Sequence, residues 1–277
     1  MAQLAACSAI KLTYNNADTL AYWWLNGYID IASEQKGLVR TEIGGYLQWH
    51  RQSQLPEYAR LLREGQKRIA GNPTKADFLA DFDLARKQGE IALLQAAPAL
   101  ADIALSMRPQ QLARLEKKFA SNNDDFRKKH MRGDLEKRLK NRYKRSLEQY
   151  EFWFGRFSRE QEEQIRRASD ARPMEEELVL AGRMERQARI VAMVRKFMQE
   201  RPPREQVVAT ITQFAQEASA PPRDPAQRAY YDSFLNGTAA LTETVVRIAT
   251  PEQKAHAQRK LQELIDFCNE MSARKRT

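Results

Sequence analysis

Apolar residues spaced three, four or seven positions apart are the feature that most constrains what this chain can fold into. Such residues lie along one side of an α-helix, because the helix has about 3.6 residues per turn. The pattern predicts one helix of unusual length over about 110–154, with Asn122-Asn123 and Gly133 as candidate breaks. The residues that carry it are Leu112, Leu115, Phe119, Phe126, Leu135, Leu139, Tyr143, Leu147, Tyr150 and Phe154.

The rest of the chain also reads as helix. The fold predicted is all-α, an elongated multi-helix bundle without a sheet, and the scarcity of glycine, 11 in 277 residues, agrees with it. A single helical domain over 8–277 is expected, and the proline-containing segment 219–225 is either a subdivision or a rigid corner. The further helices are expected over 16–31, 34–51, about 56–70, 74–95, 158–171, 175–199, 204–217, 226–248 and 251–271, with Pro98 and Pro109 interrupting the chain after 95.

Several of these helices begin with the same local chemistry. Phe157-Ser158-Arg159-Glu160-Gln161 and Ala249-Thr250-Pro251-Glu252-Gln253 each place a hydroxyl before the first turn and a glutamine three residues later. Met107–Gln111 and Arg201–Gln206 are looser versions, and Thr74 with Asp77 forms a related pair. A hydroxyl oxygen and a side-chain acceptor in this arrangement satisfy exposed N–H groups at a helix start. Capping explains the pattern, which also resembles the helix starts of Spy-type periplasmic chaperones.

The start of the chain is typical of a bacterial lipobox. Leu4-Ala5-Ala6-Cys7 places two small residues before a cysteine, as signal-peptide cleavage requires, and that cysteine would then carry fatty acyl chains such as palmitate. Only Met1-Ala2-Gln3 precede it, so residues 1–7 are interpreted as the remnant of a truncated lipoprotein signal peptide. Because Ser8 is not an aspartate, the usual sorting rule favours the outer membrane.

Four further segments point to a known family. The stretch Tyr14–Leu25 (YNNADTLAYWWL) is followed by Trp49-His50-Arg51, by Leu55-Pro56-Glu57-Tyr58 and by Phe152–Gln161. Together they resemble a family of all-helical Gram-negative lipoproteins of unknown function, over most of the chain. The resemblance implies a lipidated Cys7 at a membrane that faces the periplasm, and it implies no catalytic residues.

Positive charge is concentrated in one segment. The formal net charge is +10, and the segment 127–145 holds ten basic residues against Asp134 and Glu136 only. Such a cluster attracts nucleic acid, anionic lipid or acidic polypeptide alike, whereas a charged helix face that only meets water is the alternative. If it binds a partner, the candidate residues are Arg127, Lys128, Lys129, Arg132, Lys137, Arg138, Lys140, Arg142, Lys144 and Arg145.

Large aromatic residues are concentrated near the N-terminus. Two interpretations are open for them: the core of a pair of helices, in which Trp49 packs on Trp23 or Trp24, or contact with lipid headgroups. Helical spacing favours the core. The residues are Tyr22, Trp23, Trp24, Tyr28, Tyr46 and Trp49.

Signatures of enzymatic chemistry are absent. His50, His130 and His256 are far apart in the sequence and match no metal-binding spacing, and no phosphate-binding loop or nucleophile elbow occurs. Cys268 is expected to be a small buried apolar residue. No run of about 18 apolar residues suggests a transmembrane span. We therefore expect no enzyme, no catalytic residues, no metal site and no cofactor.

Two function classes remain. The first is a membrane-anchored periplasmic lipoprotein that binds polypeptide or envelope components through apolar grooves, in a chaperone-like or scaffold role. The second is a cytoplasmic nucleic-acid-binding helical protein, which the basic segment favours. Acylation of Cys7 would discriminate between them, because it is incompatible with the second. A third class, the helical lipase foldases, has no motif in this chain. The first class is the prediction, with nucleic acid an unexpected partner.

Overall fold

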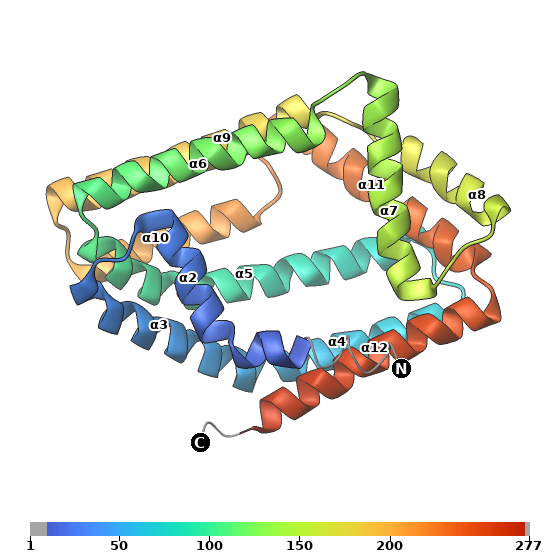
Figure 1. Ribbon diagram of the computed structural model, residues 1–277, viewed down its shortest axis with the longest axis horizontal. Coiled ribbons are helices and arrows are strands. Elements are labelled where there is room, and N and C mark those ends of the chain that lie inside the picture. The colour runs from blue at the N-terminus through green and yellow to red at the C-terminus, as the bar shows by residue number, and fades with distance from the viewer. Residues whose placement is uncertain (1–9, 275–277) are drawn as a thin grey trace. The chain divides into compact units, whose positions relative to one another are not determined.

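The computed structural model describes residues 10–274, and all regular structure within that range is helical (Figure 1). The all-α prediction is confirmed. Cys7 and the predicted lipobox lie outside the described residues. Residues 10–15 are helical, and the elements that follow are α2 (Ala17–Ile29), η1 (Ser33–Gln35), α3 (Lys36–Trp49), the π-helix η2 (His50–Gln54), α4 (Leu55–Ala70), α5 (Lys75–Ser106), α6 (Pro109–His130), α7 (Leu135–Phe154), α8 (Arg159–Asp170), α9 (Glu176–Glu200), α10 (Arg204–Ser219), α11 (Pro225–Ile248) and α12 (Pro251–Ala273).

The chain forms two compact units, each assembled from three separate segments. Unit 1 comprises the chain up to His50 together with Arg86–Lys129 and Glu177–Pro221. Unit 2 comprises Arg51–Ala85, His130–Glu176 and the chain from Pro222 onward. One passage from unit 1 to unit 2 therefore falls at 221–222, within the proline-containing segment 219–225.

The single helix expected over about 110–154 is two helices, so that prediction is wrong. Helix α6 ends at His130, and α7 begins at Leu135. Gly133 lies between them with φ +90°, a conformation that side chains disfavour, and a Cβ there would lie 2.6 Å from the Lys137 side chain. Asp134 then caps α7 by accepting a hydrogen bond from the Lys137 N–H at 2.8 Å. The break is at Gly133, one of the two candidate sites, because glycine and aspartate favour a stop and a restart.

Pro98, in contrast to Gly133, does not interrupt a helix. The expected helix over 74–95 runs on as α5 to Ser106, with Pro98 inside it. Ala97 and Ala101, on either side of that proline, are completely buried in a core of unit 1. Packing on both sides of the proline stabilises helical geometry that the local sequence alone disfavours. At the start of α5, Thr74 and Asp77 form the predicted reciprocal cap.

The length and composition of α5 also satisfy the criteria for a membrane-spanning helix. Ala97 and Ala101 of its apolar stretch are buried inside the protein, but only 22% of that stretch is buried, so burial in a core does not by itself account for its composition. Asp102, in the same helix, is paired with Arg204.

In unit 2, α8 lies against α7 and α11, and α12 lies against α4 and α7. The described residues of this unit include a core cluster among these helices. The apolar residues of α7 supply one side of it, which agrees with the predicted stripe, although Leu135 at its start is exposed. The buried members are Phe78, Phe154, Phe157, Ile165, Ala239, Leu241, Val245, Val246 and Ala257.

Unit 1 contains three smaller clusters. One joins α5 to α9 and α10, the second joins α2 to α3 and α5, and the third joins α6 to α9. Their largest buried members are Phe197 and Ile211, Tyr22 and Ile29, and Leu112 and Leu115 respectively.

Glutamines at helix starts form reciprocal pairs in both units. In unit 2, Gln161 and Gln253 each accept a hydrogen bond from the N–H of their own helix cap, as predicted, and their amides also bond to each other at 2.9 Å and 3.2 Å. In unit 1, Gln35 and Gln111 make the same arrangement, at 3.1 Å and 2.7 Å. The capping interpretation is confirmed, and each pair of glutamines additionally links the first turns of two helices by hydrogen bonds.

Each of these amides also donates a hydrogen bond to a carbonyl at or just beyond the end of the helix that precedes its partner glutamine. Gln161 donates to the carbonyl of Ile248 and Gln253 to that of Arg156, both at 2.7 Å. Gln35 donates to the carbonyl of Ser106 at 2.6 Å. Ile248 and Ser106 are the last residues of α11 and α5, so Gln161 and Gln35 satisfy carbonyls that a helix end leaves without an intrahelical partner, whereas Arg156 lies in the turn beyond α7.

Candidate functional site

The predicted basic segment does not form one continuous surface on a single helix. Arg127, Lys128 and Lys129 belong to α6 in unit 1, whereas the basic residues from Arg132 onward belong to unit 2. The side chains that are mostly exposed to solvent are Arg127, Lys128, Lys129, Arg132, Lys137, Lys140 and Lys144.

Arg142 is the clearest exception, since only 9% of it is exposed. Its guanidinium donates to the carbonyls of Pro173 and Ser169, both at 2.9 Å, just beyond and at the end of α8. Burial lowers the pKa of Arg142, and the negative charges of Asp170 and Glu176 oppose that shift. The prediction of a solvent-facing Arg142 is wrong, because this cation serves as a cap for the carbonyl end of α8.

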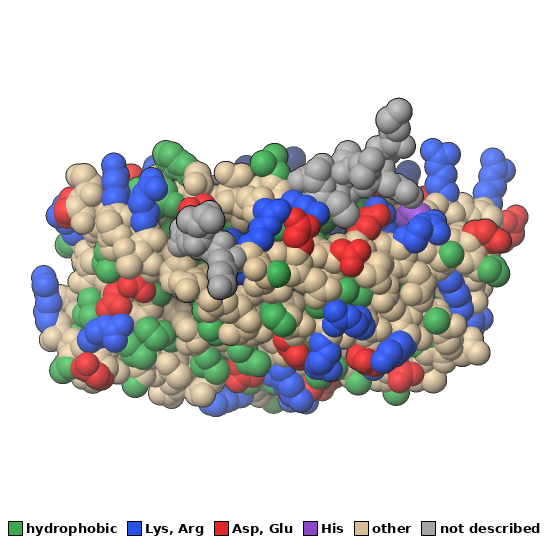
Figure 2. Space-filling model, turned by 90° about the horizontal axis from the view of Figure 1, so that it is seen from below, with side chains coloured by type: hydrophobic (Ala, Val, Ile, Leu, Met, Phe, Trp, Pro, Cys, Tyr) green, Lys and Arg blue, Asp and Glu red, His purple; other side chains and the backbone are tan. Residues whose placement is uncertain are grey.

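Acidic residues outside the segment 127–145 neutralise part of its charge. Arg127 pairs with Asp124 at 2.9 Å, one turn back along α6. Further pairs are Lys128 with Asp125, Lys144 with Glu148 and Arg138 with Glu176. On a different face of the molecule, seen from below in Figure 2, acidic and basic side chains are also interspersed. The excess of charge in the linear sequence therefore overstates the positive field at the surface.

The N-terminal aromatic residues divide into buried and exposed ones. Tyr22 is buried in unit 1, but Trp23 and Trp24 are 64% and 65% exposed. Trp49 packs against Tyr46, with their ring centroids 5.4 Å apart, and also lies near His50. The prediction that Trp23 and Trp24 form a core with Trp49 is wrong. On α2 the inner face is filled by other side chains, and the two indoles point away from it.

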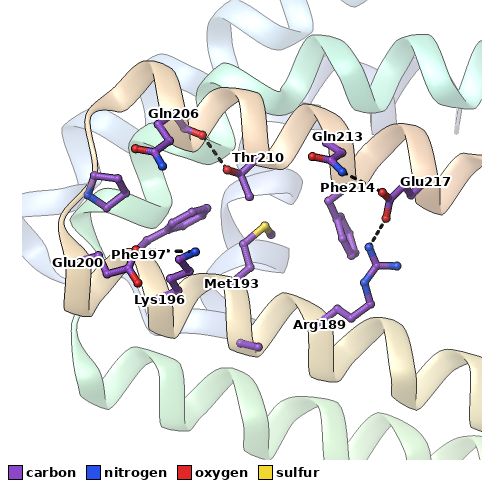
Figure 3. A pocket seen from close by; sticks show the side chains of 12 residues that line it. Arg189, Met193, Lys196, Phe197, Glu200, Gln206, Thr210, Gln213, Phe214 and Glu217 are labelled. Atoms are coloured by element: carbon purple, nitrogen blue, oxygen red, sulfur yellow. Dashed lines mark hydrogen bonds and ion pairs between the residues drawn. The ribbon is translucent and has the colours of Figure 1, made fainter.

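A groove lies between α9 and α10 in unit 1 (Figure 3). Its volume is about 380 Å³. Met193 and Phe197 of α9 and Phe214 of α10 point into the space between the two helices. Phe197 is itself buried, since it also belongs to the core that joins these helices to α5. The floor of the groove is therefore apolar and held by the core beneath it.

Polar side chains border this floor. Arg189 and Glu217 form an ion pair across one end of the groove, and the Arg189 guanidinium lies 5.0 Å from the centre of the Phe214 ring. Gln206 and Gln213 lie on the α10 side. An apolar floor with a rim of amides and charges suits an amphipathic segment, which buries apolar side chains and leaves polar groups at the edge.

A second hollow of about 490 Å³ lies on the other side of Phe197. It is lined by the turn between α5 and α6 and by the last residues of α9, among them Leu105, Pro109, Leu112 and Met198. Arg195 and Glu116 form an ion pair at its edge. Unit 1 thus carries two depressions near the C-terminal end of α9, of which the first is mainly apolar and the second mixes polar and apolar side chains, and sequence periodicity alone did not reveal them.

The described residues provide no evident centre for catalysis. Among them, no group of three or more His, Cys, Asp or Glu side chains is placed to hold a metal ion. His50 bonds to the Tyr14 hydroxyl at 3.0 Å and His256 to the Trp153 carbonyl at 2.8 Å. Burial lowers the pKa of His50 and raises that of the Cys268 thiol, which is 4% exposed. His50 and His256 thus form hydrogen bonds within the fold, and Cys268 is buried, as expected.

Comparison of the sequence with protein-family models gives a match over most of the chain. Residues 27–216 match the model of a "Family of unknown function (DUF6279)". No curated protein and no solved structure matches the chain. The match covers well over half of the chain and includes α9 and most of α10, and hence the groove.

Proposed function

This chain belongs to the family of unknown function DUF6279, and membership in that family assigns no activity. From the sequence and the surfaces described above, we propose that it is a non-enzymatic, lipid-anchored periplasmic protein that binds polypeptide. The groove between α9 and α10 is the observation that carries the proposal. It receives an unfolded or amphipathic segment of a client protein, in a chaperone-like or scaffold role.

The chemistry of the groove supports this assignment. Met193, Phe197 and Phe214 provide apolar area without a specific polar arrangement that would select one small ligand. Methionine and phenylalanine side chains adapt to varied apolar partners, as on other promiscuous binding surfaces. Lys196 with Glu200, like Arg189 with Glu217, place both signs of charge on the rim. Such a rim tolerates clients of mixed sequence.

The compartment is inferred from the sequence. Leu4-Ala5-Ala6-Cys7 supports acylation of Cys7, and Ser8 favours the outer membrane over the inner. A bacterial lipoprotein carries two or three acyl chains, and each buried CH₂ contributes about 0.8 kcal/mol to membrane binding. The anchored protein would then face the periplasm.

The groove is tested with an unfolded, soluble probe, reduced and carboxymethylated α-lactalbumin, by fluorescence anisotropy. Replacing Phe214→Ser should weaken binding at least about tenfold, because about 1.5–3 kcal/mol accompanies full burial of such a side chain. Leu100→Ser is the matched control: Leu100 is 41% exposed on α5 and does not line the groove. It should leave the affinity within about twofold, since a surface change of this kind is usually small. Equal loss in both variants, or no binding by the wild type, would contradict the proposal.

The anchor is tested separately on the full-length gene product, expressed in its bacterial host with an alkyne-labelled palmitate. We expect the label on the wild type and none on Cys7→Ser. An unlabelled wild type, together with an unmodified Cys7 in mass spectrometry, would remove the membrane part of the proposal. Salt-resistant, sequence-selective binding to duplex DNA would instead favour the cytoplasmic nucleic-acid-binding alternative, because attraction to phosphates alone falls steeply with salt.

A further inference from the structure

The outward face of α2 is apolar although it is exposed. Leu20, Trp23 and Trp24 are 49%, 64% and 65% exposed. Successive helical residues are rotated by about 100°, so these three side chains and Gly27 fall within about 100° of one another around the helix. Asp18 and Lys11 are the charged residues of the segment 10–29, and Asp18 lies about 140° from Trp23 around the helix. The face formed by Leu20, Trp23, Trp24 and Gly27 is called the α2 face below.

The interior of unit 1 does not account for the α2 face. Tyr22 and Ile29, on the other side of the same helix, are 6% and 4% exposed and supply its core contacts. Helix α2 is therefore apolar on both sides, unlike an ordinary surface helix, which is polar on its outer side. Aromatic side chains each present about 150–250 Å² when fully exposed, so the two indoles alone leave roughly 200–300 Å² of mostly apolar surface. Together with Leu20, this area is near the lower end of the range of about 300–600 Å² for the largest apolar patch on a typical monomer, and that patch is often functional.

Each indole of the α2 face packs against a tyrosine ring, and a cation lies over each of these two tyrosine rings. Trp23 packs edge-on against Tyr22, with ring centroids 5.8 Å apart, and Trp24 packs against Tyr28 at 4.8 Å. The Arg40 guanidinium lies 4.9 Å from the Tyr22 ring, and the Lys118 ammonium lies 5.8 Å from the Tyr28 ring. Trp23 thus contacts Tyr22, whose ring lies near Arg40, and Trp24 contacts Tyr28, whose ring lies near Lys118.

We infer that the α2 face lies against a phospholipid bilayer, with Trp23 and Trp24 at the boundary between headgroups and acyl chains. Indole and phenol rings prefer this depth, and nearby Lys and Arg side chains meet the phosphates. The inference rests on the proposed anchor at Cys7. Ile10, the first described residue, is three positions beyond Cys7, and three residues of extended chain span at most about 11 Å. An acylated Cys7 would hold the helical segment that starts at Ile10 next to the membrane, and α2 follows that segment directly in the chain. This proximity in the chain makes lipid the occupant that the α2 face fits best.

The test supplies the anchor chemically, so that it does not depend on acylation in the cell. The chain is coupled through Cys7 to a maleimide phospholipid in vesicles of phosphatidylethanolamine and phosphatidylglycerol. Mass spectrometry verifies a single attachment, as expected because Cys268 is buried and burial raises the pKa of its thiol. Brominated lipids then quench those tryptophans that contact the bilayer.

Two variants carry complementary pairs of tryptophans. Trp49→Phe/Trp153→Phe keeps only the two indoles of the α2 face, whereas Trp23→Phe/Trp24→Phe keeps only the other two. We expect brominated lipid to lower the fluorescence of the first variant at least about twofold, and that of the second by much less. Equal quenching in both variants overturns the inference. Absence of quenching in both also overturns it, and dimerisation that shields Trp23 and Trp24 would assign the face to a second copy.

These outcomes separate the inference from the proposed function. Failure to find acylated Cys7 in the host removes the proposed anchor and leaves the vesicle measurement unchanged. Failure of quenching in the coupled protein removes membrane contact by the α2 face, while acylation and polypeptide binding by the groove between α9 and α10 are measured independently.

Discussion

Replacing Arg142→Met distinguishes a structural role of this cation from a role in binding partners. Arg142 is buried, and its guanidinium donates two hydrogen bonds of 2.9 Å to the carbonyls of Ser169 and Pro173. Methionine has a similar length and no donor, so the substitution leaves these carbonyls without that partner. We expect the end of α8 to be destabilised while the backbone fold is retained.

The magnitude follows from the two hydrogen bonds. A hydrogen bond that involves a charged group contributes about 1.5–3 kcal/mol, so the two contribute about 3–6 kcal/mol. Removing the guanidinium also removes its desolvation cost, and methionine gains apolar burial, which offsets part of the loss. The expected decrease in the free energy of unfolding is about 2–4 kcal/mol. Arg142→Lys should recover only part of it, because a lysine cannot reach both carbonyls with a planar fork.

Lys144→Met is the matched control from the same helix. The Lys144 side chain is 75% exposed and pairs with Glu148 at 3.9 Å, so its removal should change the free energy of unfolding by about 0.5 kcal/mol or less. Urea unfolding followed by circular dichroism gives the global effect. Hydrogen exchange of peptides from α8, compared with peptides from α9 in unit 1, gives the local one, which is needed because a chain of two units need not unfold in a single step. An Arg142→Met protein as stable as Lys144→Met would refute the capping role.

Three further substitutions have defined outcomes. Hydrogen bonds from Arg204 hold the pKa of Asp102 below its ordinary value of 3.8, so their stabilisation is complete above that value and is lost as the pH falls through the lowered pKa. Asp102→Asn should therefore cost up to about 1 kcal/mol at neutral pH, and acid-denaturation curves should show the difference from the wild type shrinking below pH 3.8 and vanishing below the lowered pKa. A Cβ at position 237 would lie 2.9 Å from Cγ and 3.4 Å from Cα of Arg172, so Gly237→Ala should lower the urea midpoint by the equivalent of about 1–3 kcal/mol; an unchanged or higher midpoint would show that Arg172 yields freely. Gln161→Ala leaves the Ile248 carbonyl without its 2.7 Å bond and should cost about 1–3 kcal/mol by the same assay, and a cost near zero would mean that water replaces the amide.

The sequence by itself determined the helical fold and the helix starts. Apolar spacing and capping depend on residues within one or two turns of each other, so Thr74, Ser158 and Thr250 with their partners were predictable. The break at Gly133 followed the same local chemistry, but the apolar spacing on its two sides, which favoured one continuous helix, concealed it.

Only the tertiary structure decided which side chains meet over long separations. The glutamine pairs join positions 76 and 92 residues apart, and no local pattern selects their partners. The same holds for the groove, whose sides come from two helices, and for Arg142, whose acceptors are carbonyls of another segment. Trp23 and Trp24 show the physical reason most directly. Periodicity indicates that a helix has apolar faces, but which of two apolar faces is buried depends on the neighbouring helices that pack against it.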